Sequence, residues 1–203
     1  MTYNSTLHHR RSIRLKNYDY SQNGMYFVTI CTQGWKCLFG KVAENDKGEM
    51  ICVLNKVGKI AHDEIQKTEQ IRDNVRIDCF IVMPNHIHAI IVINNPSVGA
   101  YGNTSVGAYG NTPLQGSNTP LQKQTKSKFQ SPSKNLGAII RGYKSTVTKQ
   151  INELQNTPGT TIWQRNYYEH IIRNEKSLKK IRNYIFHNAV KWKKDKFYKK
   201  QNV

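Results

Sequence analysis

Segments with the two-residue period of β-strands alternate along this chain with segments that have the spacing of helices. Residues 25–33 are rich in β-branched and aromatic side chains and are bounded by glycines, which predicts a strand. Residues 75–84 and 86–93 predict two more strands, and Pro84-Asn85 between them predicts a hairpin turn. We expect a further short strand within residues 161–173.

Three helices are predicted, over residues 57–71, 135–154 and 175–192, because apolar side chains recur three or four positions apart. The last helix should begin near Asn174-Glu175 as its cap. The apolar stripes comprise Val57, Ile60, Ala61, Ile65 and Ile71, then Leu136, Ile139, Ile140, Tyr143 and Val147, then Leu178, Ile181 and Ile185. The order βαββαβα predicts an α+β, ferredoxin-like fold, an antiparallel sheet with helices packed on one face.

Low-complexity sequence interrupts this order, since residues 97–112 are "SVGAYGNT" repeated without change. Small, polar and turn-forming residues have no apolar face to bury. We therefore expect a single domain over residues 1–203 with a repeat loop inserted at residues 94–133. Alternatively, Tyr101 and Tyr109 in the repeats could stack on the bases of single-stranded nucleic acid.

The charge of the chain indicates a polyanionic partner. Lys and Arg number 31 against 13 acidic residues, which gives a formal net charge of +18. Residues 1–122 hold 12 basic and 9 acidic residues, whereas residues 123–203 hold 19 and 4. The C-terminal part should therefore make most of the contacts with nucleic acid.

Other features of the composition favour a cytoplasmic protein without a membrane partner. No apolar run approaches the roughly 20 residues of a membrane span, and the N-terminus lacks the apolar core of a secretion signal. The four cysteines stand singly, without a CxxC pair, so we expect reduced, small apolar side chains and not zinc ligands or disulfides.

Two histidines, His86 and His88, stand in the apolar run "FIVMPNHIHAIIVI". In a strand they point to the same side with α-carbons about 7 Å apart, so two imidazoles could converge on one metal ion. The alternative is a pair of buried histidines satisfied by hydrogen bonds. The apolar surroundings and the tight turn favour the metal, because a metal offsets the burial of polar rings and the turn fixes their direction.

The last predicted helix carries two further candidates, Tyr184 and Asn188, four residues apart and hence on one helical face. Asn188 could give a carbonyl oxygen to the metal while Tyr184 directs its phenol at the same ion. Alternatively, Tyr184 packs and Asn188 caps the helix.

Four blocks of the chain together resemble the REP-associated tyrosine transposases, a branch of the single-tyrosine HUH transposases, where HUH stands for His, hydrophobic residue, His. The blocks are "RRSIRLKNYDYSQNGMYFVTICTQ", "VMPNHIHAIIVI", "WQRNYYEHIIRN" and "IRNYIFHN". The resemblance covers essentially the whole chain except the repeat loop. One position departs from it, because Ala189 stands where many relatives have proline.

The resemblance implies a metal-dependent endonuclease and transposase that acts on single-stranded DNA, and we expect the substrate strand to contain a hairpin. By motif position, Tyr184 corresponds to the nucleophile, and His86, His88 and Asn188 to the metal ligands. The chemistry agrees, because a phenol with a pKa of about 10 needs a nearby cation to act at neutral pH. The resemblance implies Mn or Mg, and two imidazoles with one amide lean toward Mn.

Basic and aromatic residues outside this group are candidates for contacts with DNA. They are Arg10, Arg11, Arg14, Lys16, Trp163, Arg165, Arg173, Lys193 and Lys194. Two other functions remain open: a domesticated single-stranded DNA-binding protein that no longer cuts, and a nickase of the replication-initiator kind. We expect a monomer, with a dimer as the alternative.

Overall fold

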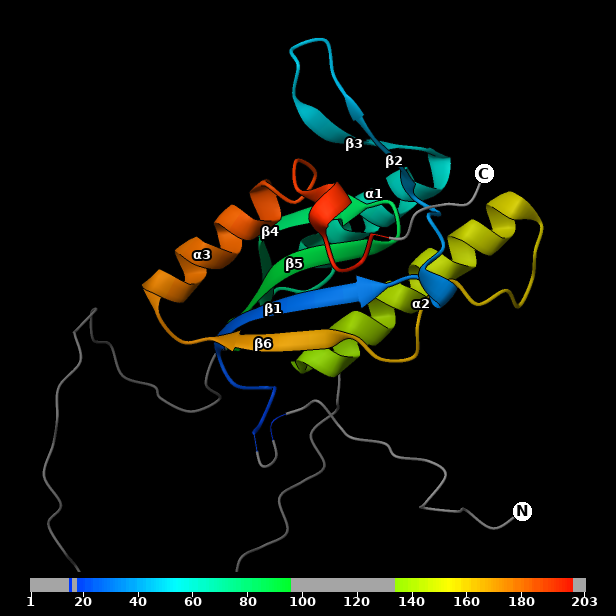
Figure 1. Ribbon diagram of the computed structural model, residues 1–203. Coiled ribbons are helices and arrows are strands. Elements are labelled where there is room, and N and C mark those ends of the chain that lie inside the picture. Colours follow the sequence, from blue (N-terminus) through cyan, green and yellow to red (C-terminus); the bar gives the residue numbers. More distant parts are fainter. Residues whose placement is uncertain (1–14, 16–17, 96–133, 199–203) are drawn as a thin grey trace, which may run out of the picture.

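The computed structural model describes residue 15, residues 18–95 and residues 134–198 (Figure 1). The predicted repeat loop lies outside these residues except for its first two, Asn94 and Asn95. Arg10, Arg11, Arg14 and Lys16 also lie outside them.

A four-stranded antiparallel sheet with the strand order β4-β5-β1-β6 forms the centre of the fold. Its strands are β1 (Gly24–Cys31), β4 (Val75–Met83), β5 (His86–Ile93) and β6 (Tyr168–Ile172). The helices are α1 (Lys56–Gln70), α2 (Leu136–Gln155) and α3 (Glu175–Phe186). The order β1-α1-β4-β5-α2-β6-α3 around this sheet confirms the predicted α+β, ferredoxin-like fold, and β4 and β5 form the predicted hairpin.

Different helices cover the two faces of the sheet. Val28 of β1 and Ile87 of β5 belong to the main core, which they share with α1 and α2. The adjacent Phe27 packs on the opposite side, together with Leu178 and Ile185 of α3. The expectation that all helices share one face is therefore wrong for α3. The physical reason is that the central strands are apolar on both faces, so both need cover from water.

Between β1 and α1 along the chain, the protein forms a second, two-stranded sheet that was not predicted. It consists of β2 (Gly40–Glu44) and β3 (Met50–Leu54), paired antiparallel. At the turn, Asn45 Oδ1 accepts hydrogen bonds from the backbone N–H groups of Lys47 and Glu49, at 3.0 and 2.8 Å, and Gly48 has a φ of 77°. Asparagine and glycine signal a turn, but β2 is too short to display a strand period.

Each main helix begins at an asparagine whose side-chain oxygen accepts a hydrogen bond from the backbone N–H three residues later. These N-caps are Asn55, Asn135 and Asn174. Replacing such a cap by alanine typically costs about 1 kcal/mol. The cap at Asn174 confirms the predicted start of the last helix, and it fixes where Tyr184 falls along α3.

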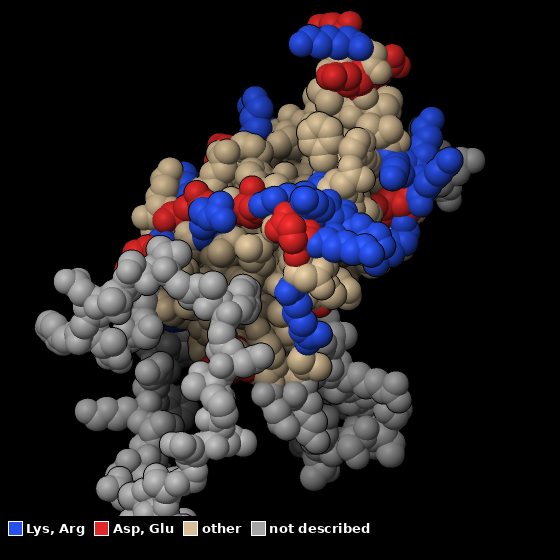
Figure 2. All heavy atoms as spheres, turned by 90° about the vertical axis from the view of Figure 1, so that its left-hand side faces the viewer, with Lys and Arg blue, Asp and Glu red and all other residues tan. Residues whose placement is uncertain are grey.

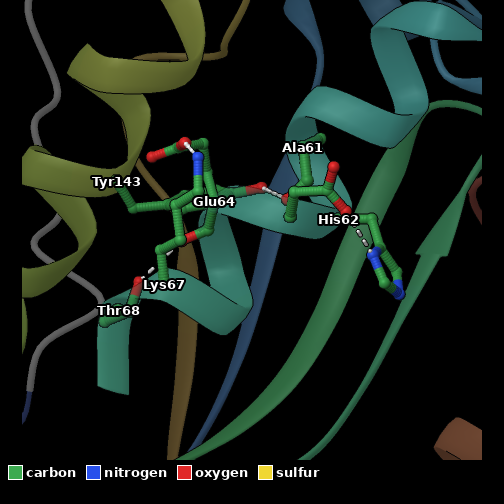
Figure 3. Close-up of polar contacts among 7 residues, drawn as sticks. Ala61, His62, Glu64, Lys67, Thr68 and Tyr143 are labelled. Carbon is green, nitrogen blue, oxygen red and sulfur yellow. Dashed lines mark hydrogen bonds and ion pairs between the residues drawn. The ribbon is translucent and has the colours of Figure 1, made fainter. Parts of the chain in front are cut away.

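Tyr143 joins α2 to α1 and takes no part in the site described below. Its phenol is buried and donates to the backbone carbonyl of Ala61 at 2.8 Å (Figure 3). Close by on α1, the buried Glu64 accepts a hydrogen bond from Lys67 Nζ at 2.7 Å. These contacts make Tyr143 a packing residue of the helix interface.

The two ends of the repeat segment meet at one point of the fold. Asn95 Nδ2 donates to the carbonyl oxygen of Lys134 at 3.5 Å and also to that of Ser21. We expect that replacing residues 96–133 by a short Gly-Ser linker changes the free energy of unfolding by less than about 1 kcal/mol, because loop-closure entropy varies slowly with length. Urea unfolding of both chains measures this difference. A large loss of stability would show that the repeats are structural.

None of the helices in the described part of the chain is both long and apolar enough to cross a membrane. Cys31, Cys37, Cys52 and Cys79 are all free thiols. This agrees with the expectation that they are small apolar side chains and not partners in disulfides.

Candidate active site

His86 and His88 lie side by side on β5, on the face of the sheet that α3 covers. Both side chains are fully buried, and their ring centroids are 4.5 Å apart. Phe27 of β1 stacks on His88 at 5.3 Å, and Phe197, close to the C-terminus, lies 4.6 Å from His86. The period of the strand therefore brings the two imidazoles together in an apolar setting.

Asn85 fixes which nitrogen of His86 carries the hydrogen. The Asn85 side-chain amide donates to the carbonyl oxygens of Phe197 and Trp35, at 2.8 and 3.3 Å, which sets its orientation. Its oxygen lies 2.8 Å from His86 Nδ1. Because an amide oxygen only accepts, Nδ1 must donate, and the lone pair of His86 is on Nε2.

Thr29 plays the corresponding part for His88. Its hydroxyl lies 2.8 Å from His88 Nδ1 and comes from the residue opposite in β1. Second groups that orient a histidine in this way are typical of metal-binding imidazoles. Each of the two rings therefore presents Nε2 away from the group that holds it.

Both imidazoles are neutral at physiological pH. Burial lowers the pKa of His86 to about 4. Burial also holds the pKa of His88 well below its usual range, and the charges of His86 and Lys196 act in the same direction. A neutral imidazole is the form that binds a metal, so the site needs no deprotonation of histidine at neutral pH.

The phenol of Tyr184 points into the same site from α3. Its oxygen lies 3.1 Å from His88 Nε2 and 3.3 Å from Asp195 Oδ2. The ring is 36% exposed, so the phenol is open to solvent on one side. Burial raises the pKa of Tyr184 to about 12, and the charge of Asp195 acts in the same direction. The phenol is accordingly protonated at neutral pH without further help.

Asn188 is buried beside Asp195, with its Nδ2 donating to Asp195 Oδ2 at 3.1 Å. The spacing predicted that Asn188 shares a helical face with Tyr184. It does not, because α3 ends at Phe186. Ala189 packs with Met83 and Trp192 in a small apolar cluster. The turn after α3, not the helix itself, brings Asn188 to the site.

Asp195 belongs to the site but was not predicted. Ligand atoms of His86, His88 and Asp195 all lie within 4.8 Å of one another, so this group could hold a metal ion. The backbone N–H of Phe197 donates to Asp195 Oδ1 at 2.8 Å and helps to hold the carboxylate. In the sequence, Asp195 stands out as the one acid in the basic run "KWKKDKFYKK", which is the signal that could have marked it as a site residue.

The donor set fits a divalent metal ion. At this site two buried polar atoms, His86 Nε2 and Asn188 Oδ1, have no hydrogen-bond partner among the described residues. Such atoms cost free energy unless something binds them. Imidazole nitrogens with amide and carboxylate oxygens suit Mn and, with a larger share of oxygen, Mg.

The candidates for DNA contacts have unlike surroundings. Trp163 is 5% exposed and lies against Phe39 and Tyr143, so it has no open face for a base and does not enter the proposed interface. The other described candidates are exposed: Arg165, Arg173, Lys193 and Lys194. Lys196 was not among them, yet its Nζ lies 5.7 Å from the Tyr168 ring and 4.8 Å from the Phe197 ring, next to the site.

An ion pair ties α3 to the edge strand β4 and so positions Tyr184. Arg182 Nε and Nη2 donate to the two oxygens of Asp78, at 2.7 and 2.6 Å. The side chain of Asp78 is 5% exposed and that of Arg182 44%. The hydrogen bonds from Arg182 hold the pKa of the Asp78 carboxyl below its usual range.

We expect Asp78→Asn to lower the free energy of unfolding by about 1–2 kcal/mol at neutral pH, a figure reduced for the exposure of Arg182. Because the pKa of Asp78 is lower in the folded chain than in the unfolded chain, its carboxylate stabilises the fold at pH values above the unfolded-state pKa. This stabilisation is lost as the pH falls through the folded-state pKa. The difference should therefore shrink below a pH of about 4. Urea unfolding across pH measures it. The matched control is Glu153→Gln, whose 3.9 Å pair with Lys149 is exposed and should contribute little.

No family model matches the chain. A Haemophilus influenzae protein is 40% identical to it over 197 residues, which cover 97% of each chain, and is described as uncharacterized. This chain belongs to the same family as that protein. Identity at this level over nearly the full length means that the family shares one fold and one domain plan.

Two solved structures are also similar to this family member. A REP-associated tyrosine transposase bound to a REP hairpin is 18% identical, with a TM-score of 0.45, and the match covers 88% of this chain and 74% of the other. A candidate transposase from Deinococcus radiodurans is 11% identical, with a TM-score of 0.41 and coverage of 86% and 95%. Both of these proteins are described as transposases.

Proposed function

We propose that the chain is a metal-dependent transposase that cuts and rejoins single-stranded DNA through a covalent bond to Tyr184. The observation that carries the proposal is the position of the Tyr184 oxygen, 3.1 Å from His88 Nε2. It lies beside two buried polar atoms without partners, His86 Nε2 and Asn188 Oδ1. A packing tyrosine needs no such neighbours.

His86, His88 and Asn188 would hold the ion, as the sequence motifs imply, and Asp195 is a fourth candidate from the geometry. When bound, Mn or Mg would favour the phenolate and withdraw charge from the phosphate. Asn85 and Thr29 contact Nδ1 of the two histidines and so leave each Nε2 available to bind the ion. All of these residues come from one chain, so the site can form without a partner's side chains.

Tyr184 would attack a backbone phosphate of the DNA. Its oxygen forms a bond to phosphorus as the bond from phosphorus to the 3′ oxygen breaks, which leaves a 5′-phosphotyrosine and a free 3′ hydroxyl. Asp195 Oδ2, 3.3 Å from the phenol, is placed to accept its proton, and the leaving oxygen takes up a proton. Because the bonds broken and formed are of similar energy, a second 3′ hydroxyl can reverse the step and join strands without ATP.

The substrate we propose is a folded single strand with a hairpin. The net charge of +18 supports a nucleic-acid partner, since lysine and arginine gain affinity by releasing counterions from phosphate. The exposed Arg165, Arg173, Lys193 and Lys194 are the described candidates for these contacts.

The test is to incubate the protein with a library of labelled hairpin strands and Mn, then run a denaturing gel. We expect a labelled band that migrates with the protein and is sensitive to protease. Binding without such a band, across varied hairpins and both metals, would instead favour a DNA-binding protein that does not cut.

A further inference from the structure

The end of α3 and the β2–β3 hairpin border a groove whose apolar side chains are open to solvent. Phe186 is 79% exposed, Val190 60% and Ile51 40%. With Phe80 they line a groove of about 710 Å³. A second hollow of about 620 Å³ adjoins it along β4 and shares Phe80 and Phe186. Contiguous apolar side chains left exposed in this way mark interaction surfaces.

Four side chains with planar rings line this groove: Phe80, Phe186, His62 and His187. The His62 imidazole lies 5.1 Å from the Phe80 ring, and the His187 imidazole lies 5.0 Å from the Phe186 ring. Aromatic faces accept nucleobases by stacking whatever the base, because every base has a π-face. The lining therefore suits unpaired bases and requires no particular sequence.

The border of the groove carries positive charge. Arg182 lines the adjoining hollow together with its ion-pair partner Asp78, and Glu49 lines the groove itself. The excess of positive charge comes from α3, which carries Lys176, Lys179 and Lys180 against one acid, Glu175. Figure 2 shows a largely uncharged area below the charged tip of the hairpin, with a band beneath it in which Lys and Arg side chains alternate with Asp and Glu side chains. An apolar protein segment would gain nothing from this border, whereas the phosphates of a nucleic acid would.

We infer that this groove binds unpaired nucleobases of single-stranded DNA, with the phosphates along the basic border of α3. The inference rests on the proposed function and extends it to a second contact outside the catalytic centre. Phe186 follows Tyr184 by two residues, so at 3.6 residues per turn the two side chains leave α3 on nearly opposite sides. A strand held in the groove passes around α3 before it reaches Tyr184.

The test measures equilibrium binding of a fluorescent oligothymidylate and of a matched abasic strand, which keeps the phosphates but lacks bases. The full chain is used with a chelator, so that no cutting occurs. Phe186→Ala should weaken binding of oligothymidylate about fivefold or more, and Phe186→Trp should restore it. Neither change should alter binding of the abasic strand. The control Leu154→Ala removes a side chain 50% exposed on α2, away from the groove, and should behave as wild type.

Unchanged binding of oligothymidylate by Phe186→Ala overturns the inference, as does an equal loss for both strands. A wild type that is dimeric by light scattering, with a monomeric Phe186→Ala variant, would assign the groove to a second copy instead. The covalent adduct with a hairpin strand and Mn is measured separately on the same proteins. If wild type forms the adduct but Phe186→Ala binds oligothymidylate as wild type does, the proposed function stands and the groove inference fails. If wild type forms no adduct, the proposed function fails, but the comparison of oligothymidylate with the abasic strand still tests the groove.

Discussion

Tyr184→Phe should abolish the covalent adduct with DNA, by at least about a thousandfold, while the fold and DNA binding survive. The change removes one hydroxyl from a side chain that is 36% exposed, and the ring can still pack against Phe27, at 6.2 Å between centroids. What is lost is the only atom of this side chain that can attack phosphorus. The measurement is the protein-linked band formed with a labelled hairpin strand and Mn on a denaturing gel.

Two other tyrosines serve as controls for this result. Tyr143→Phe loses the hydrogen bond to Ala61 and about 1 kcal/mol of stability, but it should still form the adduct. Tyr168→Phe alters an exposed ring beside Lys196 and should form it too. If the band disappears in Tyr143→Phe and persists in Tyr184→Phe, the nucleophile lies on α2 and the proposed assignment is wrong.

His88→Ala and His86→Ala should each weaken Mn binding by at least about 100-fold, since even changes to groups behind a ligand commonly cost 10- to 100-fold. Cleavage should fall below detection. Affinity for DNA should remain within severalfold of wild type, because it comes mainly from the basic residues and is lost steeply with salt. Calorimetry or the electron spin resonance of Mn reports the metal independently of the reaction.

His170→Ala is the matched control, because His170 is an exposed histidine of the same sheet, on β6. It should bind Mn and cut DNA as wild type does. Circular dichroism establishes that the variants of the buried histidines are folded. Normal cleavage by a folded His86→Ala or His88→Ala protein would sink the metal assignment and leave the pair as buried, hydrogen-bonded side chains.

Most of the fold could be predicted from local patterns in the sequence. The alternation in residues 86–93 and the cap at Asn174 are short-range signals, and both are found in the structure. The prediction placed α3 on the same face as the other helices, which was wrong. When a strand is apolar on both faces, its sequence does not determine which helix packs on which face. The β2–β3 hairpin is missing from the prediction because β2 is too short to display a strand period, although β3 is apolar.

The site could be predicted only as far as its members stand in recognisable spacing. His86 and His88 are two residues apart, so their common direction follows from the strand period. Asp195 reaches them through the turn after α3 and a 3-10 helix at Trp192–Lys194, and no periodicity records such a path. The groove at Phe186 could not be predicted from the sequence for a similar reason, since it is lined by the β2–β3 hairpin and the end of α3, which are far apart along the chain.

The amide of Asn85 has a consequence for the timing of activity during protein synthesis. It orients His86, and it is itself held by the carbonyl of Phe197, a residue 112 positions later. Asp195 comes from the same late stretch. A nascent chain that has left the ribosome only as far as α3 can form its sheet but lacks these residues, so we expect it to be unable to cut DNA.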